Sequence, residues 1–174
     1  MREPVRGVVR RLRLAVLLGS LLAAPRGAGS DAAAPLVDPR LGPLVARTVE
    51  RAAARLADPG CALVLGDFSD LRSGRPLSAT LAASGRSPSS FLASLRFVDG
   101  DHTDRCRHRA AFAWVPVGAE VVFVCRSRFE PLIRKDEWLA GNVLVHESLH
   151  ALGLGEDPPA SEEITLAVVH RCGR

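Results

Sequence analysis

The segment HESLH, residues 146–150, places two histidines four positions apart, with a glutamate directly after the first. In a helix each residue turns the chain by about 100°, so His146 and His150 lie on one face, one turn apart. Two imidazoles in this arrangement can bind one cation, and nitrogen ligands at about 2.0–2.1 Å suit Zn²⁺. Glu147 then lies beside the ion, where a carboxylate can act as a general base toward water. The segment therefore predicts a zinc site with Glu147 as its catalytic carboxylate.

The residues on either side of the motif favour a buried helix. They are apolar apart from the motif itself: Val143, Leu144, Val145, Leu149, Ala151 and Leu152. Burying two histidines and a glutamate without a ligand would carry a large desolvation cost. The alternative is a helix whose histidines and glutamate face solvent, and the apolar surroundings favour the metal site over it.

With this motif the sequence resembles the zincin metallopeptidases, zinc enzymes that hydrolyse peptide bonds. The metzincin branch extends the pattern to HExxHxxGxxH, in which a glycine lets the chain turn back and the last position supplies the third ligand. In this chain Gly153 occupies the glycine position and Glu156 the last one. A carboxylate is also a zinc ligand. The resemblance therefore implies that zinc is held by His146, His150 and Glu156.

The same resemblance implies how the site would work. Glu147 would take a proton from the water and later pass it to the leaving amine. An extended peptide or protein substrate would bind along a sheet edge, for which the segment Val121–Cys125 is the candidate strand. The expected function is that of a secreted zinc metalloendopeptidase. The alternative is a non-catalytic exported domain in which the zinc is structural or the site only binds peptides.

Parts of the metzincin pattern are missing, so some assignments stay open. The only methionine starts the chain, which excludes a methionine turn beneath the metal. Other candidates for the third ligand are Asp157, by analogy with the aspzincins, and Glu162 or Glu163 on a later helix, as in the gluzincins. The chain contains no tyrosine, so His170 or Arg171 is the candidate that would stabilise an oxyanion in the transition state.

The charge of the chain is concentrated at its start. The formal net charge is +4, and residues 1–30 alone carry six arginines against one glutamate, so the remainder is close to neutral. No nucleic-acid partner is therefore expected. The basic stretch runs into an apolar segment, residues 14–24, followed by small residues, which is the order of a secretory signal peptide. This apolar segment is shorter than the about 20 residues that span a bilayer.

These features predict three parts: a signal peptide over residues 1–30, a linker over 31–42 and a single domain over 43–174. Cleavage near residue 30 would release a secreted or periplasmic protein, without stable membrane insertion, that we expect to be a monomer. The alternative is an uncleaved N-terminal anchor. The four cysteines in an exported domain predict two disulfides. Three pairings are possible, and the preferred one joins Cys61 to Cys106 and Cys125 to Cys172.

Periodicity and turn residues predict an α+β fold, with a small mixed sheet followed by the motif helix and a C-terminal helix, as in a reduced zincin-like domain. A strand is expected over 61–68, another over 95–101, and a hairpin over 110–125. Helices are expected over 43–57, 76–83, 88–95, 136–153 and 161–172. Two further histidines, His102 and His108, are assigned to a solvated loop anchored by Cys106, with metal binding as the alternative.

Overall fold

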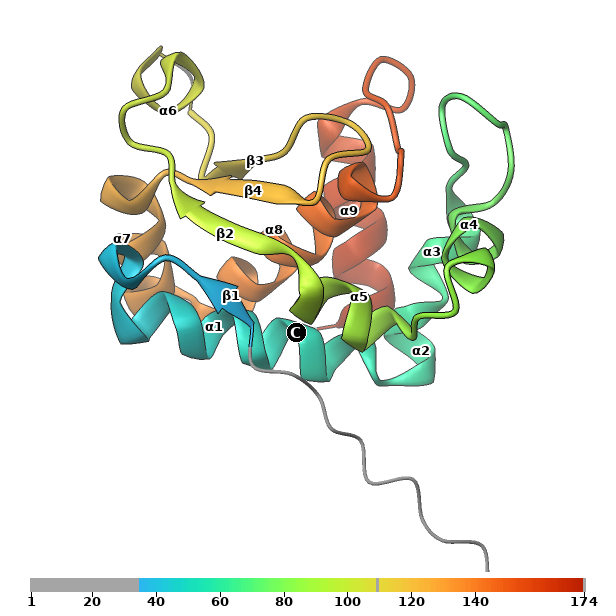
Figure 1. Cartoon of the computed structure of the whole chain (residues 1–174), viewed down its shortest axis with the longest axis horizontal. Coiled ribbons are helices and arrows are strands. Elements are labelled where there is room, and N and C mark those ends of the chain that lie inside the picture. Colours follow the sequence, from blue (N-terminus) through green and yellow to red (C-terminus); the bar gives the residue numbers. More distant parts are fainter. Residues whose placement is uncertain (1–34, 109, 174) are drawn as a thin grey trace, which may run out of the picture. The chain divides into compact units, whose positions relative to one another are not determined.

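A computed structural model describes residues 35–108 and 110–173, so the predicted signal peptide lies outside the described residues. These residues form a four-stranded mixed sheet with helices packed against it, which confirms the α+β class (Figure 1). The strand order is β1-β2-β4-β3. Their bounds are β1 (Leu36–Val37), β2 (Arg96–Asp99), β3 (Ala113–Trp114) and β4 (Val121–Val124). The first three strands in this spatial order are parallel, and β3 pairs antiparallel with β4.

The five predicted helices appear as α1, α4, α5, α8 and α9, and five further helices in the described residues, η1, α2, α3, α6 and α7, were not predicted. They are η1 (Pro39–Leu41), α1 (Gly42–Leu56), α2 (Pro59–Ala62), α3 (Val64–Asp67), α4 (Leu77–Ala83), α5 (Pro88–Ser94), α6 (Asp104–His108), α7 (Arg126–Lys135), α8 (Glu137–Ala151) and α9 (Ser161–Cys172). The Ser87 side chain caps α5 by accepting a hydrogen bond from the backbone N–H of Ser90 at 3.1 Å. No helix in the described residues is long and apolar enough to cross a bilayer.

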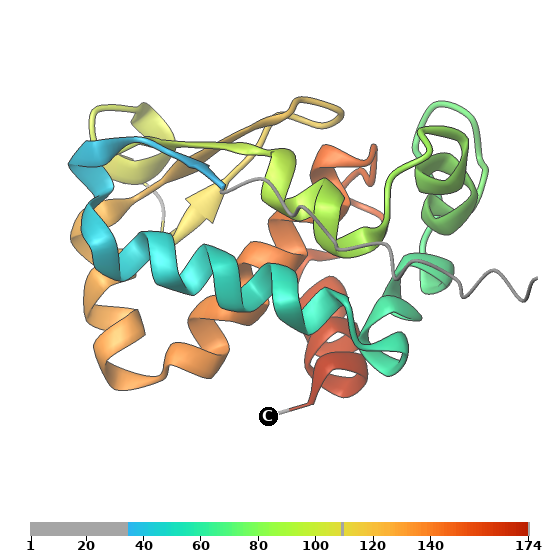
Figure 2. The same ribbon diagram turned by 60° about the horizontal axis from the view of Figure 1, so that its bottom comes forward.

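Helix α8 lies at the centre of the packing. It contacts α1, α7 and α9, and also strands β3 and β4, and Figure 2 shows α1 running past it. Most of its residues from Ala140 to Ala151 are buried, whichever way they face. A helix that is apolar on all sides belongs in the interior. The HESLH segment is therefore held by packing from several elements.

The predicted strand over residues 61–68 is wrong, because this segment forms the short helices α2 and α3. The Asp58 side chain accepts hydrogen bonds from the backbone N–H groups of Gly60, at 2.9 Å, and Cys61, at 3.1 Å. Pro59 occupies the first turn, where its missing N–H costs nothing. The Asp58-Pro59-Gly60 sequence, which follows the end of α1, therefore begins the next helix.

The predicted linker, residues 31–42, contributes structure from Leu36 onward. Leu36 and Val37 pair with β2 as strand β1, and the Leu41 side chain is fully buried. The segment is too short to show a periodic pattern, so the sequence did not indicate a strand there.

The two predicted disulfides are present, but the preferred pairing is wrong. The bonds join Cys61 to Cys172 and Cys106 to Cys125, with Cα–Cα distances of 4.1 and 5.2 Å. The end of α9 packs against α2, which brings the first pair together. The second pair links α6 to the residue that follows β4.

The predicted hairpin is confirmed, with Ala113 opposite Val124 and Trp114 opposite Phe123. The expectation that Val121–Cys125 forms a sheet edge is wrong, because β4 lies between β2 and β3. Among the described residues, β3 is the edge strand on this side of the sheet.

Candidate metal centre

Helix α8 places the two histidines of the motif in direct contact. His146 and His150 are 6% and 5% exposed, and their Nε2 atoms lie 3.0 Å apart. Glu147 is 8% exposed and lies beside them. The spacing of the sequence motif therefore produces a compact pair of buried nitrogen atoms.

Hydrogen bonds at the far side of each ring determine which nitrogen carries the proton. His146 Nδ1 lies 3.0 Å from the hydroxyl oxygen of Thr165 on α9. That hydroxyl donates its own proton to the carbonyl of Ser161 at 3.0 Å, so it accepts from the imidazole. His150 Nδ1 lies 2.9 Å from the carbonyl oxygen of Leu154, which can only accept. Both rings therefore carry a proton on Nδ1, and in the neutral form of each ring the Nε2 atom has a lone pair.

Two lone pairs that face each other at 3.0 Å cannot form a hydrogen bond while both rings are neutral. Burial, together with the neighbouring His150, lowers the pKa of His146 from 6.5 to about 3, so this ring is neutral near pH 7. A cation between the rings would satisfy both nitrogens. Two nitrogens bound to one tetrahedral Zn²⁺ would lie about 3.3 Å apart, close to the observed separation. The histidine pair thus fits a metal ion.

The chain returns to this pair through the turn after α8. Gly153 has a φ of 111°, in the region that favours glycine, and its N–H donates to the carbonyl of His150 at 3.0 Å. The turn places Glu156 Oε1 3.3 Å from His150 Nε2. One ligand atom from each of His146, His150 and Glu156 lies within 4.8 Å of the others. The structure therefore brings the expected three ligands together.

The other candidates for the third ligand do not join this group. Within the described residues, it is the only set of three or more histidine, cysteine or acidic side chains placed to share an ion. The Glu163 carboxylate instead accepts the backbone N–H of Ala160 at 3.1 Å, at the start of α9. Glu162 and Asp157 are exposed.

The environment of Glu147 differs from that of the three ligands. Burial and, to a smaller extent, the negative charge of Glu156 together raise the pKa of its carboxyl from 4.5 to about 8. A hydrogen bond with the backbone of Val115, just after β3, and the positive charge of Arg105 act in the opposite direction. A carboxyl group with a pKa near neutrality is suited to moving protons.

A cavity of about 540 Å³ opens onto these residues. One side is formed by α8 and the turn that carries Glu156, and Thr165 contributes from α9. The other side is formed by β3 and the segments next to it, with Trp114 and Arg105 among the lining residues. The volume is sufficient for a small ligand or several residues of a peptide.

The structure does not bring the predicted oxyanion stabiliser His170 to this cavity. His170 is exposed on α9, and its charge acts on Asp67. Its neighbour Arg171 is bound to Asp67 by two hydrogen bonds, at 2.7 and 2.8 Å. His102 and His108 are exposed, but the expected loop is wrong for His108, which lies in helix α6. Neither histidine belongs to a group of potential metal ligands in the described residues.

Sequence analysis missed Thr165, Arg105 and the carbonyl of Leu154. Thr165 was recognisable only as a single threonine in the predicted final helix, and Arg105 as one of several arginines in a polar segment. A backbone carbonyl leaves no signal in a sequence at all.

No protein-family model, no curated protein and no solved structure matches this chain.

Proposed function

We propose that this protein is a secreted zinc-dependent peptidase. The observation that carries the proposal is the pair of Nε2 atoms, 3.0 Å apart, in two buried rings whose other nitrogens are already hydrogen-bonded. Both rings point their free nitrogens at one place, and Glu156 adds a carboxylate there. Two imidazoles and one carboxylate form a ligand set that suits Zn²⁺.

The number of protein ligands supports a catalytic rather than a structural zinc. Structural sites are closed by four protein ligands, whereas catalytic sites use three and leave a position open. Three described side chains form the group here, and the cavity lies beside them. Zn²⁺ held there would supply Lewis-acid chemistry and lower the pKa of water.

Glu147 is the proposed general base and acid. Its carboxyl lines the cavity but lies outside the ligand group. From this position it would accept a proton from the attacking water and donate it to the leaving amine nitrogen. Its burial keeps competing water away from the carboxyl.

Asn142 is a candidate donor for the oxyanion, in a chain that has no tyrosine. It lies one turn before His146, is 3% exposed and lines the cavity. Its side-chain oxygen accepts a hydrogen bond from Arg55 at 2.6 Å, which fixes the orientation of the amide. Its amide N–H groups have no acceptor among the described residues and remain available to a substrate.

A peptide is the proposed substrate because an edge strand borders the cavity. Both residues of β3, Ala113 and Trp114, line it, and β3 has a neighbouring strand only on the β4 side within the described residues. An extended peptide can add to such an edge through backbone hydrogen bonds. The two disulfides and the predicted signal peptide support an extracellular or periplasmic location.

The experiment is a comparison of the zinc-loaded parent protein with Glu147→Gln on a broad peptide library, with and without a chelator. The parent should show chelator-sensitive hydrolysis, and Glu147→Gln should lower it by about 10²–10⁴-fold while still binding zinc. Glu162→Gln, an exposed position outside the cavity, is the matched control and should keep parental activity. A zinc-loaded parent without chelator-sensitive hydrolysis would overturn the proposal in favour of a non-catalytic zinc domain.

A further inference from the structure

Arg105 is the positively charged side chain of the cavity. Among the described residues that line this space, no other lysine or arginine occurs, whereas Glu147 and Glu156 supply negative charge. Arg105 lies on α6, and its charge lowers the pKa of the Glu147 carboxyl. A guanidinium in this position faces whatever ligand enters the cavity.

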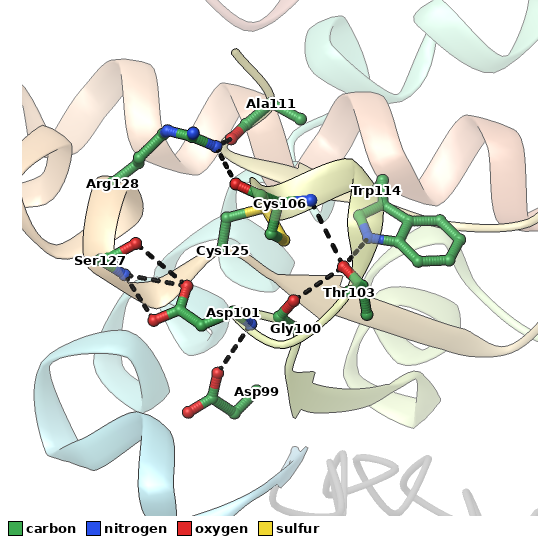
Figure 3. Close-up of a disulfide and its surroundings, with 10 residues drawn as sticks. All are labelled: Asp99, Gly100, Asp101, Thr103, Cys106, Ala111, Trp114, Cys125, Ser127 and Arg128. Atoms are coloured by element: carbon green, nitrogen blue, oxygen red, sulfur yellow. Dashed lines mark hydrogen bonds between the residues drawn. A yellow bond between two sulfur atoms is a disulfide. The ribbon is translucent and has the colours of Figure 1, made fainter. Parts of the chain in front are cut away.

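The residue after Arg105, Cys106, is anchored to the rest of the fold, and Figure 3 shows its disulfide and hydrogen bonds. Cys106 is bonded to Cys125. The Cys106 carbonyl accepts a hydrogen bond from Arg128, and its N–H donates to the hydroxyl of Thr103 at 3.4 Å. A short helix fixed by a covalent bond and these contacts can hold a side chain at a defined place.

The side chain of Arg105 rests on an aromatic surface. Its guanidinium carbon lies 5.0 Å from the centre of the Trp114 ring, within the range of a cation–π contact. The indole N–H of Trp114 donates to the hydroxyl of Thr103 at 3.2 Å, and the ring stacks on Phe123 with centroids 4.4 Å apart. The guanidinium is therefore positioned by helix α6, which the disulfide holds, and by Trp114 of β3, which stacks on Phe123.

The Arg105 side chain has no hydrogen bond and no ion pair within 4.0 Å among the described residues. Other arginines differ in this respect. On the same helix, Arg107 forms an ion pair with the Asp104 carboxylate at 2.7 Å, and on α9 Arg171 forms one with Asp67 at 2.7 Å. The planar set of N–H donors on Arg105 is thus free to bind a carboxylate, for which its geometry is well matched.

We propose that Arg105 is the residue that determines substrate specificity, by binding a carboxylate of the peptide. This inference rests on the proposed peptidase function and adds the substrate class. The substrates are peptides that carry a carboxylate close to the scissile peptide bond, which would lie beside Glu147. The carboxylate belongs either to an acidic side chain or to the C-terminus of the peptide. Both would be bound by the same charge-assisted hydrogen bonds.

The test measures peptide binding, so that it does not depend on turnover. The zinc-loaded protein carries Glu147→Gln to prevent hydrolysis and Trp138→Phe so that Trp114 is the remaining tryptophan reporter. Three N-acetylated alanine peptides serve as probes. The first has a central glutamate and an amidated C-terminus, the second has glutamine at that position and a free C-terminus, and the third has glutamine and an amidated C-terminus.

At least one carboxylate peptide should bind about tenfold more tightly than the neutral peptide, and which one does so identifies the source of the carboxylate. Arg105→Gln should abolish this preference, and Arg105→Lys should retain only part of it because an ammonium lacks the planar donor pair. Arg107→Gln makes the same charge change on the same helix, outside the cavity, and should leave the preference intact. Circular dichroism verifies that each variant is folded.

Equal binding of all three peptides, no binding of any of them, or a preference that survives Arg105→Gln would overturn the inference. The outcome is separate from that of the proposed function. Hydrolysis of peptides by the parent protein without preference for a carboxylate would support the peptidase function and overturn the role of Arg105. Carboxylate-selective binding without hydrolysis would support the binding role of Arg105 and overturn the peptidase function.

Discussion

Gly153 lies directly against the carboxylate of Asp70, so closely that a Cβ on the glycine would overlap Asp70 Oδ2. The same carboxylate accepts the backbone N–H groups of Arg72, at 3.0 Å, and Ser73, at 2.6 Å. The Gly153 carbonyl accepts the N–H of Leu71 at 2.8 Å. The turn after α8 is thus packed onto the segment that follows α3. This contact sets the path by which the chain returns to the histidines.

Gly153→Ala is expected to destabilise the protein and to weaken zinc binding. The positive φ alone costs about 1–3 kcal/mol for a residue with a Cβ, and the clash with Asp70 adds to it. Urea denaturation and competition with a zinc chelator measure the two effects. Gly66→Ala is the control, because its Cβ would meet nothing within 4 Å, and it should be neutral or slightly stabilising. A Gly153→Ala protein with parental stability would refute this account of the turn.

Loss of a residue that only orients a metal ligand lowers metal affinity about 10- to 100-fold. Glu156→Ala removes a direct ligand and should lower the zinc affinity by more than that. Its carboxylate is the third member of the ligand group. Glu163→Ala removes the same functional group from α9 and serves as the control. That substitution removes the hydrogen bond to Ala160 but should leave zinc affinity unchanged. Equal zinc affinities for Glu156→Ala and the parent, in competition titrations, would remove Glu156 from the site.

Thr165→Val should weaken zinc binding by about 10- to 100-fold, because the hydroxyl holds the Nδ1 proton of His146. Valine has nearly the same shape but cannot accept a hydrogen bond. Thr165→Ser keeps the hydroxyl and should retain most of the affinity. Chelator competition on the three proteins provides the comparison, and indistinguishable affinities for the valine and serine variants would count against the orienting role.

The metal-free protein should lose stability as the pH rises toward 8. The folded-state pKa of Glu147 is raised from 4.5 to about 8, so its contribution is fully present below the unfolded value and is lost as pH rises through the folded one. The slope from this group is at most about 1.4 kcal/mol per pH unit. Glu147→Gln should remove the decline, as measured by urea denaturation with excess chelator.

His146 acts in the opposite direction in the same measurement. Its folded-state pKa is lowered from 6.5 to about 3, so the stability it contributes above pH 6.5 is lost as the pH falls toward 3. This loss of stability at acidic pH should also occur in the Glu147→Gln variant. A metal-free Glu147→Gln protein with the parental pH profile above pH 5 would contradict the assignment.

The five predicted helices and the hairpin followed from local patterns that tertiary contacts did not override. The apolar positions of α1 and the capping serine of α5 are encoded within a few residues, and so are the two strands joined by Pro116–Gly118. The short apolar segment 61–68 was ambiguous, since period alone does not distinguish a strand from a buried helical turn. The segment begins as a helix because the side chain of Asp58 caps the N-terminus of α2.

The site was predictable where it is local and not where it depends on distant elements. The contact of His146 with His150, and the return of Glu156, follow from positions within one helix and its turn. Thr165 reaches the site through the packing of α9 on α8, and Arg105 through β3 and a disulfide bond. The disulfide pairing itself depends on which chain ends meet in space, so spacing along the sequence could not select it.

The most direct test of the metal site is the zinc content of the folded protein after equilibrium dialysis. The parent protein should bind one zinc ion per chain, and His150→Ala should bind none under the same conditions. X-ray absorption on the parent should show nitrogen and oxygen ligands at about 2.0–2.1 Å. A folded parent protein without stoichiometric zinc, or a His150→Ala protein that binds zinc as tightly as the parent, would contradict the account.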